Sequence, residues 1–226
     1  MRIGILGGSF NPVHIGHLRL ALEARELLHL DRVDLVPAAV PPHKPGTNLL
    51  PFGLRYRLLR LSAVNLSGLD VNLMEARRGG LSYTWDTLSA YQRELPGSRL
   101  FFLLGVPELF DLSTWKHGLD LTRMADLVAV ARQGMAFEEV HSLVHQYWPG
   151  ALGPEILPAT TTEVHIWHLP VNGRLLMIRP PFLEISSTLI RSYWVRKRSL
   201  RFLVPTNVAQ ELELRRRVVE RFWDKS

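Results

Sequence analysis

Blocks of apolar and polar positions alternate along the chain in a way that predicts strands separated by helices. Continuous apolar runs of four or five residues are typical of strands buried on both faces. They occur at residues 3–6, 100–104, 127–131 and 175–178, and we also expect strands at 33–36 and 71–74, where Asp34 and Asn72 interrupt the apolar run. Stretches with apolar residues every three or four positions predict helices. These lie at residues 18–28, 54–66, 84–95, 186–194 and 206–222, the last with Thr206 as its predicted cap.

The order of these elements predicts an α/β fold with a doubly wound, mostly parallel sheet. We expect the run at 100–104 in the centre of the sheet and the run at 175–178 at an edge. Residues 155–175 follow no clear period. No repeat or linker divides the 226 residues, so we expect a single domain over 1–226 with a small C-terminal helical part from about residue 185. Ligands of such sheets bind beyond the C-terminal strand ends, here in the loops predicted at 7–16, 37–45 and 105–115.

Composition narrows the classes of function. The chain has no cysteine, which excludes disulfides, thiolate nucleophiles and cysteine zinc sites and favours a cytoplasmic protein. We expect residues 1–3 to begin a strand and not a signal peptide, and the apolar run there is too short to span a bilayer, so we expect no membrane partner. A formal charge of +6 indicates an anionic ligand. Nucleic acid is a distant alternative, since no base-stacking motif accompanies the basic runs at 196–201 and 215–217.

The first candidate site follows the first strand. Gly7 and Gly8 come directly after the apolar run, and His14 and His17 stand at the start of the next predicted helix. The spacing of the glycines fits neither a dinucleotide-binding fingerprint nor a Walker A loop. Glycines let an anion approach the backbone, and a helix start exposes free N–H groups to it. The sequence therefore predicts a phosphate site with both imidazoles as donors.

A second helix start offers a similar set of donors. Ser186 or Ser187 can cap the predicted helix, and Arg191 lies four residues after Ser187 on the same face. Hydroxyls, N–H groups and a guanidinium would then converge on one anion. Other candidates are Lys44 in a proline-rich loop, Arg132 after a strand, and Trp115, which could stack on a flat ring.

These residue types suit a reaction whose nucleophile is already ionised. The chain shows no carboxylate pair at catalytic spacing and no zinc-protease or serine-hydrolase motif. A phosphate monoester has a second pKa of about 6 and can attack the α-phosphorus of a nucleotide without a general base. The enzyme then has to align the reactants and stabilise the charge that builds on departing pyrophosphate. Magnesium would arrive with the triphosphate, so no dedicated metal site is expected.

The motifs together resemble those of a known superfamily. Residues 7–17, GGSFNPVHIGH, and residues 185–191, ISSTLIR, resemble the signature pair of the HxGH nucleotidyltransferases, which have a Rossmann-like fold. The middle motifs are PPHK at 41–44, SYT at 82–84, DTL at 86–88 and TW at 114–115. They resemble the bacterial nicotinate-nucleotide adenylyltransferases, and the resemblance covers nearly the whole chain.

The resemblance implies that ATP and nicotinate mononucleotide, as partners, give deamido-NAD and pyrophosphate, with Mg²⁺ as the cofactor. His14, His17 and Arg191 would be catalytic. ATP would contact Gly7, Gly8, Ser9, Phe10, His14, His17, Gly105, Ile185, Ser187 and Arg191. The acceptor would contact Asn11, Lys44, Thr84, Trp115 and Arg132. Transfer to nicotinamide mononucleotide, or to another phosphomonoester, stays open as the alternative.

Three positions depart from the family pattern. The family has Gly-x-Asp after the central strand, with the Asp on the adenosine side, whereas this chain has Gly105-Val106-Pro107 followed by Glu108. Only Glu108 or Asp111 could then supply the carboxylate. Gln133 replaces the proline of an Arg-Pro-Gly motif. Residues 138–173 form a longer connection, interpreted as an added lobe, a contact in a homo-oligomer or a long loop.

Overall fold

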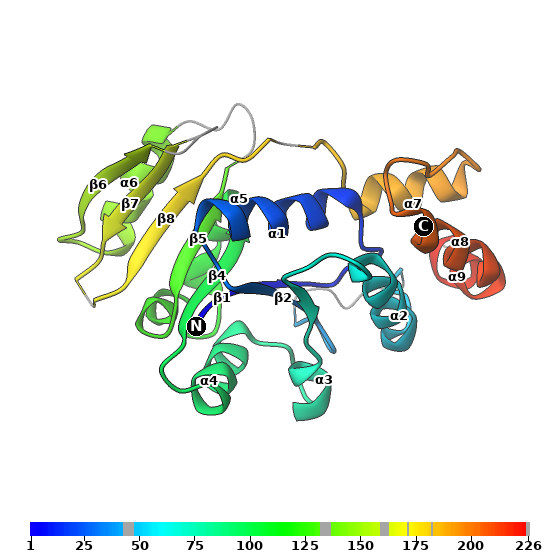
Figure 1. Cartoon of the computed structure of the whole chain (residues 1–226), viewed down its shortest axis with the longest axis horizontal. Coiled ribbons are helices and arrows are strands. Elements are labelled where there is room, and N and C mark those ends of the chain that lie inside the picture. The colour runs from blue at the N-terminus through cyan, green and yellow to red at the C-terminus, as the bar shows by residue number, and fades with distance from the viewer. Residues whose placement is uncertain (43–47, 132–136, 159–162, 171, 182, 225–226) are drawn as a thin grey trace.

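Strands and helices alternate along the chain, as the hydrophobic pattern predicts. The computed structural model describes residues 1–42, 48–131, 137–158, 163–170, 172–181 and 183–224, which form one eight-stranded sheet with helices on both faces (Figure 1). The strands are β1 (Arg2–Gly8), β2 (Arg32–Pro37), β3 (Leu69–Val71), β4 (Arg99–Gly105), β5 (Asp126–Val130), β6 (Leu152–Pro158), β7 (Glu163–His168) and β8 (Arg174–Ile178). The α-helices are α1 (Ile15–Leu27), α2 (Phe52–Ala63), α3 (Met74–Arg78), α4 (Thr84–Glu94), α5 (Val106–Phe110), α6 (Phe137–Tyr147), α7 (Ser187–Val195), α8 (Thr206–Leu214) and α9 (Arg216–Trp223). Two short 3₁₀ helices, η1 (Leu112–Thr114) and η2 (Gly118–Arg123), follow α5.

The strand order confirms the predicted doubly wound sheet. The order is β3-β2-β1-β4-β5-β8-β7-β6. The first six strands in this order, β3, β2, β1, β4, β5 and β8, run parallel. The chain winds from β1 toward β2 and β3 on one side and continues with β4 and β5 on the other. Connections that leave β1 and β4 in opposite directions open a crevice at their C-terminal ends, which is where ligands of such sheets bind.

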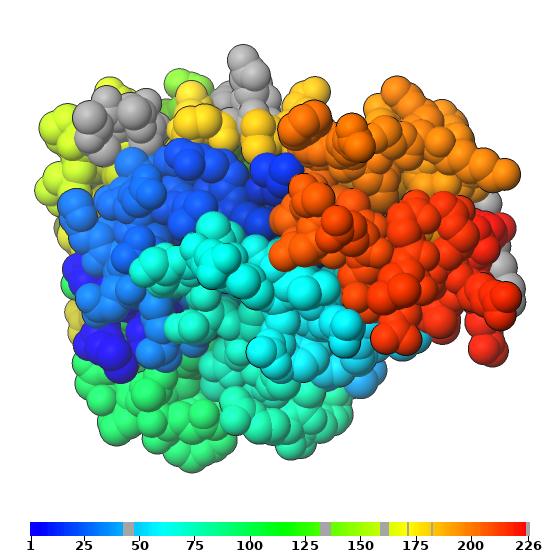
Figure 2. All heavy atoms as spheres, turned by 45° about the vertical axis from the view of Figure 1, so that its right-hand side comes forward, coloured from blue at the N-terminus to red at the C-terminus, as the bar shows by residue number. Residues whose placement is uncertain are grey.

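Alternating side chains of the central strands build one core on each face. In β4, Leu100, Phe102 and Leu104 belong to one buried cluster, and Phe101 and Leu103 belong to the other. The first cluster includes residues of α3 to α6, and the second includes residues of α1, α2, α7, α8 and α9. The C-terminal helices gather at one end of the molecule (Figures 1 and 2). Because both faces of the central strands are apolar, each face packs against its own layer of helices.

The prediction for residues 175–178 as an edge strand is wrong. β8 pairs with β5 on one side and with β7 on the other, so it lies inside the sheet. The reason lies in residues 138–173, which hold most of α6 and the antiparallel strands β6 and β7. This segment is not a long loop, because it extends the sheet beyond β8, and β6 is the edge strand on that side. The strand predicted at 71–74 also shifts, since β3 ends at Val71 and Met74 begins α3.

Two further local predictions need correction. The helix predicted at 206–222 is two helices, α8 and α9, and Thr206 does not cap α8, since Pro205 holds the cap position. The turn at Arg215 lets Leu212, Val219 and Trp223 all be buried, with the Trp223 ring edge-on to Trp194 at 5.9 Å. The predicted loop at 105–115 is mostly helical, in α5 and η1. Within the described ranges, no helix has the length and apolar character needed to cross a membrane.

Candidate active site

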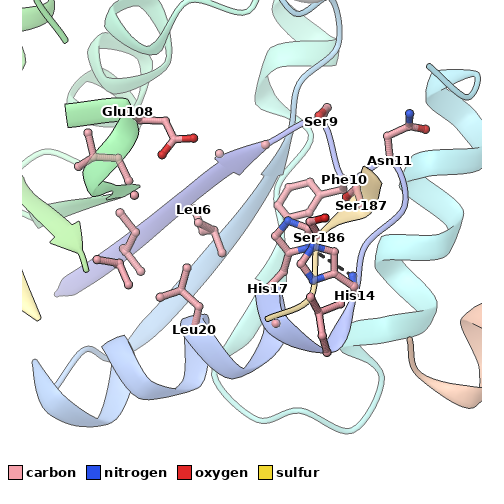
Figure 3. A pocket seen from close by; sticks show the side chains of 18 of the residues that line it. Leu6, Ser9, Phe10, Asn11, His14, His17, Leu20, Glu108, Ser186 and Ser187 are labelled. Carbon is pink, nitrogen blue, oxygen red and sulfur yellow. Dashed lines mark hydrogen bonds between the residues drawn. The ribbon is translucent and has the colours of Figure 1, made fainter. Parts of the chain in front are cut away.

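The C-terminal ends of β1 and β4 open into a cavity of about 720 Å³ (Figure 3). Twelve of the predicted site residues line this cavity: Gly7, Gly8, Ser9, Phe10, Asn11, His14, His17, Gly105, Trp115, Ile185, Ser187 and Arg191. Thr84, the first residue of α4, is not among its lining residues. Lys44, Arg132 and Gln133 lie outside the described residues. The structure thus brings together the two signature motifs from opposite ends of the chain.

The loop after β1 is held by donors to three of its carbonyl oxygens. Arg55 donates to the Ser9 carbonyl at 2.8 Å, Arg191 Nη1 donates to the Asn11 carbonyl at 2.8 Å, and Ser187 Oγ donates to the Pro12 carbonyl at 2.8 Å. Carbonyl oxygens repel phosphate, so engaging them with cations and a hydroxyl makes the loop more suitable for an anion. Ser187 and Arg191 lie on one face of α7, as predicted.

His14 and His17 form a stacked pair at the start of α1. Their ring centroids are 3.6 Å apart with the planes inclined by 27°, and the His14 backbone N–H donates to His17 Nδ1 at 3.2 Å (Figure 3). Gly16 favours this packing, because a Cβ there would stand 3.0 Å from His14 Nδ1 and the ring would have to shift by a few tenths of an ångström. The pair is therefore a preorganised unit, and the glycine between the histidines has a steric reason.

The protonation states of the pair follow from its surroundings. His14 is 6% exposed, and burial lowers its pKa to about 4, so the ring is neutral at neutral pH. Because His17 Nδ1 accepts a hydrogen bond from the His14 N–H, the neutral His17 ring carries its proton on Nε2.

The backbone at the start of α1 contributes less than the sequence indicates. The Ile15 N–H donates to the Leu203 carbonyl at 3.0 Å, and the His17 N–H donates to the His14 carbonyl at 3.0 Å. The expectation of free N–H groups here is therefore wrong for Ile15 and His17. The C-terminal segment accepts the hydrogen bond of the Ile15 N–H, and the start of the helix itself accepts that of the His17 N–H. The start of α1 therefore offers fewer backbone donors than a bare helix start would.

The start of α7 provides the second group of donors. Ser186 is the N-cap, with extended backbone, and its Oγ accepts from the Leu189 N–H at 3.1 Å. Arg191 Nη2 donates to Thr188 Oγ1 at 3.0 Å in addition to its bond with the loop. An arginine has five N–H groups, so these two bonds leave donors for a ligand in the cavity that Arg191 lines. Partial burial lowers the pKa of Arg191, and the guanidinium stays charged at neutral pH.

Glu108 lies on the opposite side of the cavity from the histidines (Figure 3). It stands in the first turn of α5, and a Cβ at Gly105 would overlap its carboxylate. Glu108 is the one carboxylate among the described residues that line the cavity, whereas Asp111 is not among them. Of the two side chains that could compensate for Pro107, the structure places Glu108 in the cavity. Trp115 also lines it, edge-on to Phe102 at 6.3 Å.

The start of α4 is tied to the segment that carries Trp115. Lys116 Nζ lies 2.7 and 2.9 Å from the two carboxylate oxygens of Asp86, and 5.1 Å from the centre of the Tyr83 ring. The ion pair therefore joins the DTL motif at 86–88 to Lys116, the residue that follows the TW motif at 114–115. This contact links the Thr84 region to Trp115 although Thr84 does not line the cavity.

Sequence reasoning missed Arg55, Asn48 and Leu49. Arg55 is 1% exposed on the inner face of α2, and the other two residues line the cavity. The signal for Arg55 is its position three and four residues before Leu58 and Leu59, which places an arginine on the apolar face of the helix. For Asn48 and Leu49 no sequence signal stands out. In the part of the chain that the structure describes, no three His, Cys, Asp or Glu side chains gather into a metal-binding group.

The fold and the site define the class of this protein as a nucleotidyltransferase. The family model described as cytidylyltransferase-like matches residues 5–193. A probable nicotinate-nucleotide adenylyltransferase of Geobacter sp. (strain M21) is 38% identical over 222 residues, covering 97% of this chain and 99% of the relative. The corresponding protein of Geobacter metallireducens is 37% identical over 209 residues, covering 92% and 94%.

A solved structure shares the fold over nearly the whole chain. Plasmodium falciparum nicotinic acid mononucleotide adenylyltransferase complexed with NaAD matches with a TM-score of 0.72 at 17% identity, covering 96% of this chain and 97% of that one. From the sequence relatives, the chain belongs to the nicotinate-nucleotide adenylyltransferase family within the cytidylyltransferase-like proteins. The family resemblance and the fold class predicted from the sequence are confirmed.

Proposed function

We propose that this protein transfers the AMP moiety of ATP to nicotinate mononucleotide, giving deamido-NAD and pyrophosphate in NAD biosynthesis. A phosphate oxygen of the mononucleotide attacks the α-phosphorus of ATP. The bond from that phosphorus to the α,β-bridging oxygen breaks, and pyrophosphate leaves with the electron pair. The observation that supports this most is the convergence of the stacked His14–His17 pair with Ser187 and Arg191 on one cavity.

The two histidines are proposed to bind the triphosphate where its charge grows. Both imidazoles would donate to phosphate oxygens, His17 from Nε2, and their stacking at 3.6 Å would keep the two rings in place. Donors that are fixed before the reaction stabilise the transition state without having to reorganise, and in many enzymes this effect provides most of the rate enhancement. Ser187 and Arg191 would bind the leaving phosphates, and Gly7, Gly8, Ser9, Phe10, Gly105 and Ile185 would line the path of the nucleotide.

Glu108 is proposed to accept hydrogen bonds from ribose hydroxyls of ATP. A carboxylate facing a triphosphate would be repelled, whereas a carboxylate facing a vicinal diol can accept two hydrogen bonds. Its place across the cavity from the histidines separates it from the proposed phosphate site (Figure 3). In this assignment, Glu108 supplies the carboxylate that the family has at the position of Pro107.

The acceptor is proposed to bind along the Trp115 side of the cavity. Trp115 would stack on the nicotinate ring, and Asn11 and the region of Thr84 would receive the rest of the mononucleotide. Lys44 and Arg132, outside the described residues, would bind its phosphate, and Thr84 with nearby backbone would receive its carboxylate. The Lys116–Asp86 ion pair supports the arrangement by tying the start of α4 to Trp115.

Magnesium is proposed to enter with ATP. The cavity offers a single described carboxylate, so hard oxygen ligands would come mainly from the phosphates and water, as Mg²⁺ prefers. The ion would neutralise part of the phosphate charge. We place the reaction in the cytoplasm, where ATP is supplied.

Pyrophosphate release tests this function directly. The wild-type protein should release pyrophosphate only when ATP, Mg²⁺ and nicotinate mononucleotide are all present. His17→Ala should lower kcat at least ~100-fold, because it removes a donor to the transition state. Its circular dichroism spectrum should match that of the wild type. Turnover of His17→Ala close to that of the wild type would contradict the role of His17.

A further inference from the structure

Arg55 is a buried cation beside the cavity to which the proposed function gives no role. Its Nη1 donates to the Ser9 carbonyl at 2.8 Å, and its Nε donates to the Leu50 carbonyl at 3.0 Å. Among the described residues its hydrogen-bond partners are carbonyl oxygens and not a carboxylate. Burial of such a charge is unfavourable and lowers the pKa of Arg55 to about 10. A buried charge that lowers stability beside a candidate active site indicates a functional role for Arg55.

Asn11 makes a parallel connection between the same two segments. Its Nδ2 donates to the Asn48 carbonyl at 2.8 Å, and its Oδ1 accepts from the Leu50 N–H at 3.0 Å. Together with Arg55, these bonds clamp residues 9–11 to residues 48–50. Residues of both segments line the cavity. The clamp therefore fixes two walls of the site relative to each other.

Phe10 lies inside this clamp in a strained conformation. Its φ is +44°, in the left-handed region that bulky residues rarely adopt, and its side chain is 1% exposed. Such a conformation persists only where the surroundings fix it. The Phe10 ring meets the His17 ring edge-on, with 5.0 Å between centroids. Anchoring the Ser9 carbonyl thus bears on the orientation of His17.

We propose that Arg55 is a positioning residue for adenylyl transfer: by holding the Ser9 and Leu50 carbonyls together, it keeps Phe10 and His17 in the geometry that turnover needs. The chain of contacts runs from Arg55 to Ser9, through the strained Phe10 backbone, to the His17 imidazole. Arg55 itself does not line the cavity. The kinetic part of this inference rests on the proposed function, and its structural part does not.

The test compares Arg55→Lys with Arg57→Lys in the full-length protein. Lysine keeps the charge but lacks the fork that reaches two carbonyls at once. Arg57 lies on the same helix, is 54% exposed at its side chain and pairs with Glu211 at 2.6 Å, so it is the matched control. Steady-state kinetics with ATP and nicotinate mononucleotide give kcat and KM. Imidazole ¹⁵N NMR reports the tautomer and hydrogen bonding of His17 without turnover.

Arg55→Lys should lower kcat at least ~10-fold per folded molecule, with a smaller change in the KM for ATP, and should shift the His17 ¹⁵N signals. Arg57→Lys should change neither the kinetic constants nor the His17 ¹⁵N signals. A kcat close to that of the wild type, a loss fully explained by unfolded protein, or unchanged His17 signals would overturn the proposal. If the wild type itself shows no turnover, the proposed function fails, and the NMR comparison still decides the role of Arg55.

Discussion

Buried His14 should make the stability of this protein depend on pH in a way that one substitution removes. The folded pKa of about 4 lies below the usual 6.5, so the unfolded chain takes up a proton in this range and the folded chain does not. The free energy of unfolding is therefore highest above pH 6.5 and decreases as the pH falls toward 4, because protonation of His14 favours the unfolded chain. The difference between the two pKa values corresponds to a total loss of about 3 kcal/mol in the free energy of unfolding, of which about 2 kcal/mol falls between pH 7 and pH 5.

The measurement is urea unfolding of wild type and His14→Asn at about pH 7 and about pH 5. Asparagine can still cap α1 but does not titrate. Other groups titrate in both proteins, so the quantity of interest is the difference between their losses. The wild type should lose about 2 kcal/mol more than the variant. Ser187→Ala, which keeps His14, should lose as much as the wild type. Equal losses in wild type and His14→Asn would refute the reasoning.

Three further substitutions test separate parts of the site. Glu108→Gln should reduce the preference for ATP over 2′-deoxy-ATP, measured as the ratio of kcat/KM values, about tenfold, since it removes a charged acceptor of hydroxyl donors; an unchanged ratio would remove Glu108 from the ribose site. Gly16→Ala should lower the free energy of unfolding by about 1 kcal/mol and also kcat, because its Cβ would stand 3.0 Å from His14 Nδ1; a fully active, equally stable variant would contradict the steric argument. Lys116→Met should raise the KM for nicotinate mononucleotide more than the KM for ATP, because it breaks the ion pair with Asp86; equal changes would show that the pair does not support the acceptor side.

The sequence predicts the parallel part of the fold well because buried parallel strands are continuously apolar. The run at 100–104 is such a case, and it lies in β4 at the centre of the sheet. The added strands escape prediction for the opposite reason. Nearly all residues of β6 are exposed, so the strand shows no apolar alternation, and the pattern consequently places β8 at an edge. The break at Arg215 has no glycine or proline to indicate it.

The candidate site divides in a similar way. Histidines, glycines and a capped helix with Arg191 are predictable because each has a local pattern, and the structure brings them into one cavity. Contacts between distant segments are not encoded locally. The bonds of Arg55 to Ser9, and of Ser187 to Pro12, join residues 46 and 175 positions apart. A buried arginine is also unusual enough that composition alone favours an exposed one.

The most direct test of the central claim is product formation by the wild type with each mononucleotide in parallel. With ATP and Mg²⁺ present, nicotinate mononucleotide should give deamido-NAD and one equivalent of pyrophosphate, with a higher kcat/KM than nicotinamide mononucleotide. Mass spectrometry of the dinucleotide and a coupled pyrophosphate assay measure both products. Absence of deamido-NAD, or faster turnover of the nicotinamide form, would contradict the account.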